Sequence, residues 1–205
     1  RYCIGFPPER WYEIADSLGF LIQDEYPIWT SVKRKGGFDK LLPGVTSERL
    51  GAEYLQWMRE RWNHPCVVIW DAQNESVTGI TGEAINLVRQ YDLSNRPWDN
   101  GWAIPVSERD AIEAHIYLFG LLKHPSEKKG YLKKLFGEVR VPQCFSPSPD
   151  GIPYRNPVIL NEYGWAWLNR DGTPTTLTDR IYSTFFPEAD TPDKRFEVYA
   201  KNLSI

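Results

Sequence analysis

The stretch His64-Pro65-Cys66-Val67-Val68-Ile69-Trp70-Asp71-Ala72-Gln73-Asn74-Glu75 decides the fold, because its apolar run stops abruptly at an amide and a carboxylate. A continuous Val/Ile run without polar alternation suits a strand covered on both faces, which is typical of a parallel sheet with helices outside it. The Asn74-Glu75 ending puts a proton-carrying group at the rim of the core. We therefore predict a buried parallel strand with Glu75 at its carboxyl end.

A second stretch repeats the pattern: Asn156-Pro157-Val158-Ile159-Leu160-Asn161-Glu162-Tyr163-Gly164 again runs from a proline through an apolar strand to Asn-Glu. In a closed parallel barrel the carboxyl ends of all strands converge on one face, so residues far apart in sequence meet there. Two carboxyl groups brought together in this way form the minimal machinery for cleaving a glycosidic bond. The alternative is that each glutamate caps the following helix or pairs with an arginine.

Strands and helices alternate up to about residue 117, which indicates parallel βαβ units and an α/β fold. The segment 47–62 begins with Ser47-Glu48 and spaces its apolar residues on one helical face. Further helices are expected near 10–19, 83–91 and 196–203, and further strands near 20–25, 96–98 and 110–117.

The order of these motifs resembles glycoside hydrolase family 2. Asn63-His64-Pro65 followed by Trp70-Asp71-Ala72-Gln73-Asn74-Glu75 is similar to the acid/base segment of that family. The stretch 20–25 looks like its third barrel strand, 110–117 like its sixth with the H-x-Y pattern, and 157–164 like its seventh. The resemblance covers about residues 1–167 and implies a (β/α)8 TIM barrel.

The resemblance also implies roles for individual residues. Glu75 would be the general acid/base and Glu162 the nucleophile of a retaining β-glycosidase. Asn74 would hydrogen-bond the sugar hydroxyl next to the anomeric carbon, a contact that strengthens in the transition state. Arg1 and Tyr117 would lie beside Glu162 and keep it ionised.

Other positions match the rim of the same pocket. His115 would line the sugar site, and Asp24, Glu25 and Asp71 match strand ends that face it. For Asp24 and Glu25, a helix-start or solvent role is equally compatible with the sequence. Flat aromatic faces suit pyranose rings, so we expect sugar stacking from the tryptophans that follow the strand ends: Trp165, Trp167, Trp98 and Trp102.

Composition excludes several other classes. The net charge of −3 gives no reason to expect nucleic acid or an anionic membrane surface as partner, and no apolar run approaches the length of a membrane span. Three cysteines without CxxC spacing and three scattered histidines do not form a metal-ligand pattern. We therefore expect neither a metal nor a cofactor, and the resemblance implies a carbohydrate partner.

The alternation of strands and helices breaks between about 118 and 153, where a lysine-rich segment precedes a turn-rich loop. So long a connection at a catalytic face is usually a lid or specificity loop. Measured against the family, the chain would run from the end of the second barrel strand to the seventh helix. We therefore expect residues 1–205 to be an incomplete TIM-barrel catalytic domain, about strands 2/3 to 7, in a polypeptide with further domains.

The resemblance thus implies a retaining, exo-acting β-glycosidase similar to β-galactosidases, with oligo- or polysaccharides as substrates. Galactosidase, glucuronidase and mannosidase specificities all occur in that family, and the residues do not decide between them. The alternative from another class is a barrel that binds sugar without turnover, although the presence of both acids argues against it. A sugar-phosphate enzyme would need a glycine-rich phosphate loop after the seventh or eighth strand. The segment 163–167 is a poor candidate for such a loop.

Overall fold

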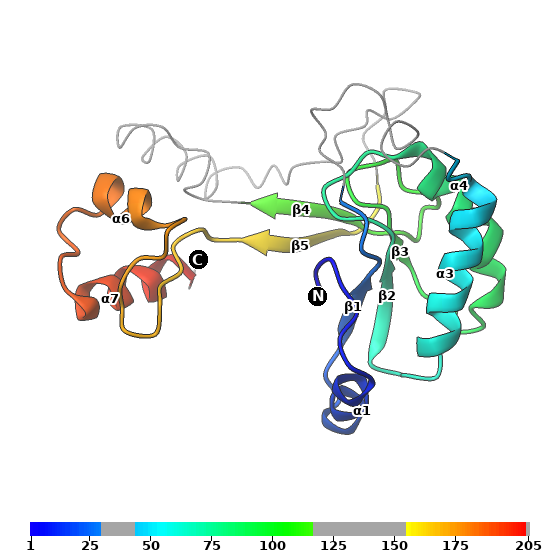
Figure 1. Cartoon of the computed structure of the whole chain (residues 1–205), viewed down its shortest axis with the longest axis horizontal. Helices are drawn as coiled ribbons and strands as arrows, with labels where there is room; N and C mark the ends of the chain where they lie inside the picture. Colours follow the sequence, from blue (N-terminus) through cyan, green and yellow to red (C-terminus); the bar gives the residue numbers. More distant parts are fainter. Residues whose placement is uncertain (30–43, 117–154, 204–205) are drawn as a thin grey trace. The chain divides into compact units, whose positions relative to one another are not determined.

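The structure is a computed structural model that describes residues 1–29, 44–116 and 155–203 (Figure 1). The described residues fall into two compact units, one built around Arg1–Glu113 and the other around Leu160–Ile205, and the chain changes unit inside β4 and β5. The elements up to β3 are α1 (Glu9–Leu18), β1 (Ile22–Glu25), α3 (Ser47–Arg61), β2 (Val67–Asp71), α4 (Gly79–Val88), η1 (Arg89–Tyr91) and β3 (Trp98–Asp99). They are followed by β4 (Ile112–Ile116), β5 (Val158–Tyr163), α6 (Asp179–Phe185) and α7 (Pro192–Leu203).

The strands form the parallel order that the sequence predicts. β1, β2 and β3 lie side by side and parallel, with Glu25 opposite Asp71 and Asp71 opposite Asp99. Parallel bridges extend this order on both sides, from Tyr2 to Asp24 before β1 and from Asp99 to Ala111 after β3. β4 pairs with β5, and the two arrows run in the same direction in Figure 1. Because the strands are parallel, β1, β2 and β3 end at the same edge of their sheet.

Local signals explain where the helices of the first unit begin and end. The Thr46 side chain accepts a hydrogen bond from the Arg49 backbone N–H at 3.3 Å, so it caps α3 one residue before the predicted start. Glu48 lies in the first turn of α3, where a negative charge is favoured by the helix dipole. Gly19 ends α1 in the left-handed conformation, with φ of 67°.

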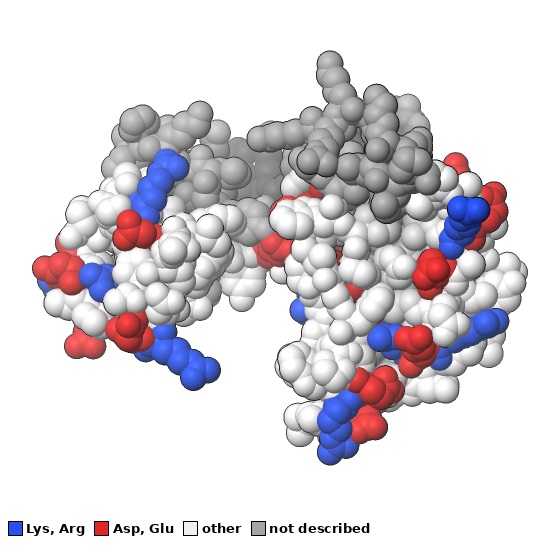
Figure 2. All heavy atoms as spheres, in the orientation of Figure 1, with Lys and Arg blue, Asp and Glu red and all other residues white. Residues whose placement is uncertain are grey.

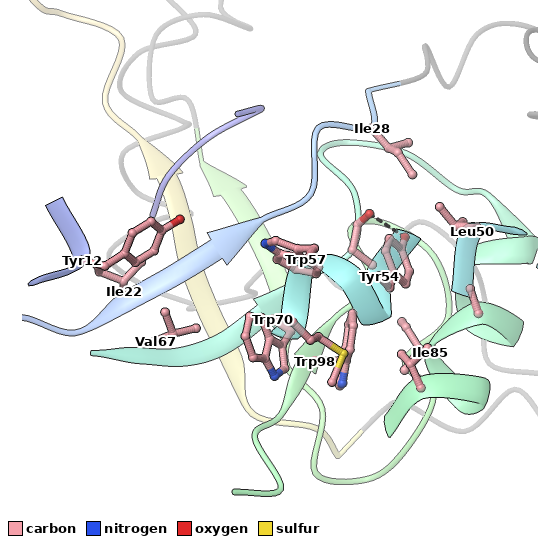
Figure 3. Packing of buried hydrophobic residues seen from close by; sticks show 14 of the residues in the cluster. Tyr12, Ile22, Ile28, Leu50, Tyr54, Trp57, Val67, Trp70, Ile85 and Trp98 are labelled. Atoms are coloured by element: carbon pink, nitrogen blue, oxygen red, sulfur yellow. Dashed lines mark hydrogen bonds between the residues drawn. The ribbon is translucent and has the colours of Figure 1, made fainter. Parts of the chain in front are cut away.

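Aromatic rings form the contact between β2, β3 and the helix α3 (Figure 3). The ring centroids of Trp57 and Trp70 lie 5.0 Å apart with an edge-to-face angle of 74°. Tyr54 donates its hydroxyl to the Ala72 carbonyl at 2.9 Å, which ties α3 to the end of β2. Trp98 belongs to this core and has no exposed surface, so its predicted sugar-stacking role is wrong.

The second unit has a smaller core. Its buried members are Ala166, Ile181, Tyr182, Phe185, Phe186 and Ala189. The Tyr182 hydroxyl donates to the Ala166 carbonyl at 2.6 Å, so α6 is fixed to the segment that follows β5. The sequence did not predict α6, which is only seven residues long. α7 confirms the helix expected near 196–203 and begins earlier.

The surface of the described residues has no strong charge asymmetry on the face shown in Figure 2, where acidic and basic side chains are interspersed. None of the helices described has both the length and the apolar character needed to cross a membrane. The predicted lid at about 118–153 lies outside the described residues.

Candidate active site

The end of β2 holds the first Asn-Glu pair in an unusual backbone conformation. Asn74 still follows the sheet, because its N–H donates to the Ile28 carbonyl at 2.8 Å. Glu75 then turns into the left-handed region with φ of 42°. For a residue other than glycine this conformation costs roughly 1–2 kcal/mol, and such strain clusters at active sites. The half-buried Glu75 therefore sits on a strained turn at the carboxyl edge of the sheet.

Arg1 fixes the side chain of Asn74. Its guanidinium donates to Asn74 Oδ1 and, through Nε at 2.6 Å, to Glu25 Oε2. A guanidinium can only donate, so the atom of Asn74 that faces it is the oxygen. The amide NH₂ of Asn74 is therefore directed elsewhere and can donate to a ligand. Glu25 also accepts the backbone N–H of Ile4, which anchors the amino-terminal segment beside β1.

A layer of buried polar side chains lies beneath this edge. Gln23 donates through Nε2 to Asp71 Oδ2 at 2.8 Å and to Asp99 Oδ2 at 3.0 Å. Arg1 approaches Asp71 at 3.4 Å and Glu113 at 3.5 Å. Burial, together with the charges of Asp99, Glu113 and Glu25, raises the pKa of Asp71 well above its usual range, although Arg1 opposes the shift. Asp71 is therefore an internal residue with no exposed surface.

Arg1 itself stays charged in this setting. Burial lowers its pKa, but the carboxylates of Asp71, Glu25 and Glu113 raise it more, so the net shift is upward. Burial raises the pKa of Glu25, while the charge of Arg1 and the hydrogen bond from Ile4 lower it. The Arg1 guanidinium is therefore a permanent positive charge next to Asn74.

Asp24 faces the opposite side of β1. Its carboxylate accepts the Tyr12 hydroxyl at 2.7 Å and the Trp57 Nε1–H at 2.9 Å, and Arg61 lies 3.3 Å away. These partners come from α1 and α3, and Asp24 has no exposed surface. The predicted substrate role of Asp24 is therefore replaced by a structural one: it joins β1 to two helices.

The second Asn-Glu pair lies within β5. His115 of β4 approaches Glu162, with Nδ1 and Oε2 3.7 Å apart. The side chain of His115 is 2% exposed and that of Glu162 is 24% exposed, so the acid is the accessible partner. His115 and Glu162 thus lie close together on adjacent strands.

The chain after β5 turns sharply. Gly164 and Trp165 both have positive φ, at 96° and 100°. The half-buried rings of Trp165 and Trp167 pack at a centroid distance of 5.1 Å. Two aromatic rings therefore follow Glu162 along the chain of the second unit, and their role in sugar stacking stays a prediction.

Two predicted contacts of Glu162 stay untested. Tyr117 lies outside the described residues. Arg1 belongs to the first unit and Glu162 to the second, and within the first unit Arg1 bonds to Glu25 and Asn74. The expected contact between Arg1 and Glu162 stays a prediction.

Four residues of the site were not predicted. Gln23 and Glu113 are buried and lie two residues from Glu25 and His115 on the same strands. Polar residues at alternate positions of an apolar strand share one face, and this spacing was the missed signal. The third is Asp99, which is buried at the end of β3. The fourth is Trp29, which is 61% exposed and pairs with Asn74 through a parallel bridge.

Two clusters that lie wholly within the first unit have metal-ligand chemistry, but neither suits an ion. His64 uses Nδ1 to bond Asp16 at 2.6 Å and Nε2 to bond Glu9 at 2.7 Å, and burial raises the pKa of the neighbouring Cys66 thiol to about 12. The buried carboxyls around Asp71 already face the Arg1 cation. We assign no metal to either cluster.

Comparison with known proteins agrees with this geometry. Residues 6–186 match the family model described as glycosyl hydrolases family 2, TIM barrel domain. A β-galactosidase of Lactococcus lactis subsp. lactis is 30% identical over 140 residues, which cover 64% of this chain and 13% of that protein. A β-galactosidase of Vibrio cholerae serotype O1 is 29% identical over 172 residues, which cover 80% of this chain and 15% of that protein. The chain thus spans only a small part of these curated relatives.

Solved structures share the fold. The β-glucuronidase of Ruminococcus gnavus, solved with an N1-substituted uronic isofagomine, superimposes with a TM-score of 0.56 at 20% identity over 95% of this chain and 33% of that one. The β-D-glucuronidase of Dictyoglomus thermophilum gives a TM-score of 0.53 at 17% identity, over 97% of this chain and 34% of that one. The TIM-barrel fold predicted from the sequence is confirmed, and the chain belongs to glycosyl hydrolase family 2.

Proposed function

We propose that the protein hydrolyses β-glycosidic bonds with retention of configuration, using Glu75 as the general acid/base and Glu162 as the nucleophile. Family membership supports the reaction class. The observation that carries the assignment is the end of β2, where Glu75 occupies a strained turn directly after an asparagine fixed by Arg1. Strain is retained where the surrounding structure holds it in place, and active sites are the usual setting.

The reaction then proceeds in two steps. The carboxylate of Glu162 attacks the anomeric carbon while Glu75 gives its proton to the glycosidic oxygen, which leaves as an alcohol. The product is a glycosyl ester of Glu162. In the second step Glu75, now a carboxylate, takes a proton from the attacking water, and the ester bond breaks to release the sugar and the Glu162 carboxylate.

Neighbouring residues hold these groups and the sugar. The Asn74 NH₂ donates to the hydroxyl beside the anomeric carbon, and Arg1 keeps the amide in that orientation. His115 contacts Glu162 from the adjacent strand. Trp165 and the exposed Trp29 offer flat faces for pyranose rings. Tyr117 is the remaining proposed substrate contact.

We propose that the substrate is a β-linked oligo- or polysaccharide cleaved from its chain end, and that further domains of the same polypeptide help to bind it. The curated relatives are named β-galactosidases, which makes a β-galactoside the first candidate. They are also much longer than this chain, which supports additional domains.

A panel of 4-nitrophenyl β-glycosides tested on the full-length protein addresses the function directly. We expect release of nitrophenol from one of the galactoside, glucuronide or mannoside substrates. A protein that binds these sugars in calorimetry without releasing nitrophenol would support the alternative, a sugar-binding barrel without turnover.

The stereochemistry has its own test. Proton NMR of the first-formed sugar should show the β anomer, because two displacements restore the configuration. A crystal structure should place the Glu75 and Glu162 carboxyls about 5–5.5 Å apart, whereas an inverting pair needs roughly 6.5–9.5 Å to admit a water. An α anomer as first product would exclude Glu162 as the nucleophile.

A further inference from the structure

A pocket lies at the edge of the sheet opposite to Asn74-Glu75. It forms between the loop that enters β2 and the loop that enters β3, so it lies at the amino ends of both strands. The full length of β2 separates it from the strained turn at Glu75. Its lining residues are Trp62, Asn63, Tyr91, Asp92, Leu93 and Ser94. The proposed cleavage reaction uses none of them.

The pocket has the size of one sugar ring. Its volume is about 170 Å³, and a cavity of roughly 150 Å³ takes up a single six-membered ring. Tyr91 and Leu93 are 48% and 95% exposed, so the pocket is open to solvent beside them. A ring bound here can therefore belong to a longer chain that continues outside the pocket.

The acidic residue of the lining is fully engaged by the protein. Asp92 Oδ1 accepts from Arg96 Nη1 at 2.8 Å and from the Ser94 N–H at 3.2 Å. Its Oδ2 accepts from Trp70 Nε1 at 3.0 Å and from the Arg96 N–H at 2.9 Å. Arg96 also donates to the Trp62 carbonyl at 2.9 Å, so the ion pair joins the two loops. The pocket thus has a fixed base and offers a ligand no free charge.

The other polar side chains of the lining are available to a ligand. Within the part of the chain that the structure describes, no residue hydrogen-bonds to the Trp62 Nε1–H, the Asn63 amide or the hydroxyls of Tyr91 and Ser94. All four groups are neutral, and together they supply donors and acceptors. The Trp62 ring packs partly against the core, so it is held in place. The lining therefore combines aromatic rings with uncharged hydrogen-bonding groups.

We propose that this pocket is a second carbohydrate site, which binds one ring of a neutral polysaccharide without cleaving it. A pyranose has flat C–H faces and a rim of hydroxyls, so it can stack on an aromatic ring while its hydroxyls pair with neutral side chains. A charged ligand would find no counter-ion among the lining residues. Binding here requires no cleavage, so it is independent of the roles of Glu75 and Glu162.

Affinity electrophoresis of the full-length protein tests binding without turnover. Native gels contain soluble β-glucan, galactan or glucomannan, and Glu162→Ala serves as the parent so that the polysaccharide stays intact. At least one polysaccharide should retard this parent. Tyr91→Ala and Asn63→Ala should each weaken that binding by about two- to tenfold, because a stacking face or a hydrogen bond is lost. Both positions are exposed, so thermal melting of the two variants should match that of the parent.

A matched control separates the pocket from other exposed aromatic residues. Trp11→Ala on α1 removes a ring that is 53% exposed and lies outside the pocket, so this variant should be retarded like the parent. Retardation that is unchanged in both Tyr91→Ala and Asn63→Ala would overturn the second site even if the protein cleaves glycosides. A parent that no gel retards, or that binds a polyanionic polysaccharide more strongly than the neutral ones, would also overturn it.

The outcome for the proposed function is read separately. Weaker retardation of the two pocket variants, with no nitrophenol released from aryl β-glycosides by the protein with Glu162 intact, would refute the proposed function and leave the second site in place. Analytical ultracentrifugation tests a protein partner at the same surface. A change of oligomeric state in Leu93→Ala, together with no retardation of the parent, would assign the pocket to a contact between copies and overturn the carbohydrate site.

Discussion

The two Asn-Glu dipeptides are identical in sequence and differ in backbone. Asn74-Glu75 lies beyond β2, which ends at Asp71, and Glu75 turns into the left-handed region, whereas Asn161-Glu162 lies inside β5. Successive side chains of a regular strand point to opposite faces, so Asn161 and Glu162 are separated by the sheet. The left-handed turn breaks this alternation, so Asn74 and Glu75 can both serve one site. Under the proposed function, one dipeptide thus delivers two functional groups and the other delivers one.

The largest expected effect comes from Glu162, the proposed nucleophile in the second dipeptide. Glu162→Ala should remove most of a rate enhancement that for enzymes generally exceeds about 10⁶-fold, because the anomeric carbon loses its nucleophile. External azide should restore part of the turnover and yield the β-glycosyl azide, detectable by NMR. Glu188→Ala is the control for an exposed glutamate of the same unit and should retain parental rates. Near-parental hydrolysis by Glu162→Ala would defeat the nucleophile assignment.

Glu75 should respond differently because its task depends on the leaving group. Glu75→Ala should retain measurable turnover on dinitrophenyl glycosides, since an activated aryl oxide needs little protonation. Turnover of alkyl glycosides should fall by about 10³-fold or more. Rates measured across a series of leaving groups test this. An equal loss for all leaving groups would mean that Glu75 is not the acid.

Substitution of the two asparagines tests the difference between the dipeptides most directly. Asn74→Ala should lower kcat/KM by about 10²–10³-fold, or about 2.7–4 kcal/mol, because a transition-state hydrogen bond is lost. Asn161→Ala should cost less than about tenfold, since its side chain faces away from Glu162. Steady-state kinetics on the same aryl glycoside give both values. Equal losses would show that the backbone turn at Glu75 has no functional consequence.

Backbone strain should distinguish the dipeptides in stability as well. Glu75→Gly should raise the free energy of unfolding by about 0.5–1 kcal/mol, because glycine adopts the left-handed conformation without strain. Glu162→Gly should lower it by about the same amount, since glycine weakens a strand. Urea unfolding of the full-length variants measures both, with Glu75→Ala as the control that keeps the strain. Stabilisation by Glu75→Ala as large as by Glu75→Gly would point to charge instead of conformation.

An effect of similar size, confined to low pH, is expected at the opposite end of β2, where His64 bridges Asp16 and Glu9. Burial lowers the pKa of His64, but the hydrogen bonds to Asp16 and Glu9 raise it by more than burial lowers it. The net shift of the His64 pKa is therefore upward. A raised histidine pKa contributes stability that is complete below about pH 6.5 and is lost as pH rises through the folded-state pKa. His64→Gln should therefore destabilise by about 1 kcal/mol at about pH 5.5 and by much less at alkaline pH.

Chemical unfolding of parent and His64→Gln across this pH range gives the difference. Arg10→Gln removes an exposed ion pair with Glu13 on α1 and should show a smaller effect with no change across the same range. A His64→Gln penalty that grows with pH would reverse the assigned direction.

The sequence by itself determined the elements and the chemistry at their ends. The unbroken apolar run 67–70 suits a strand that is covered on both faces. This pattern predicted a parallel strand, which the structure confirms as β2. The motif around Asn74-Glu75 indicated the family, which the family model confirms. Local residue patterns carry this information because strand burial and helix capping depend on near neighbours.

Tertiary structure alone decided which face each polar side chain uses. Asp24 and Glu25 are adjacent in sequence, yet Asp24 bonds to Tyr12 and Trp57 of the helices while Glu25 bonds to Arg1 inside the sheet. The physical reason is the two-residue period of a strand: an error of one position moves a side chain to the other face. The grouping of buried acids around Arg1 likewise depends on the register between strands, which no single segment of sequence encodes.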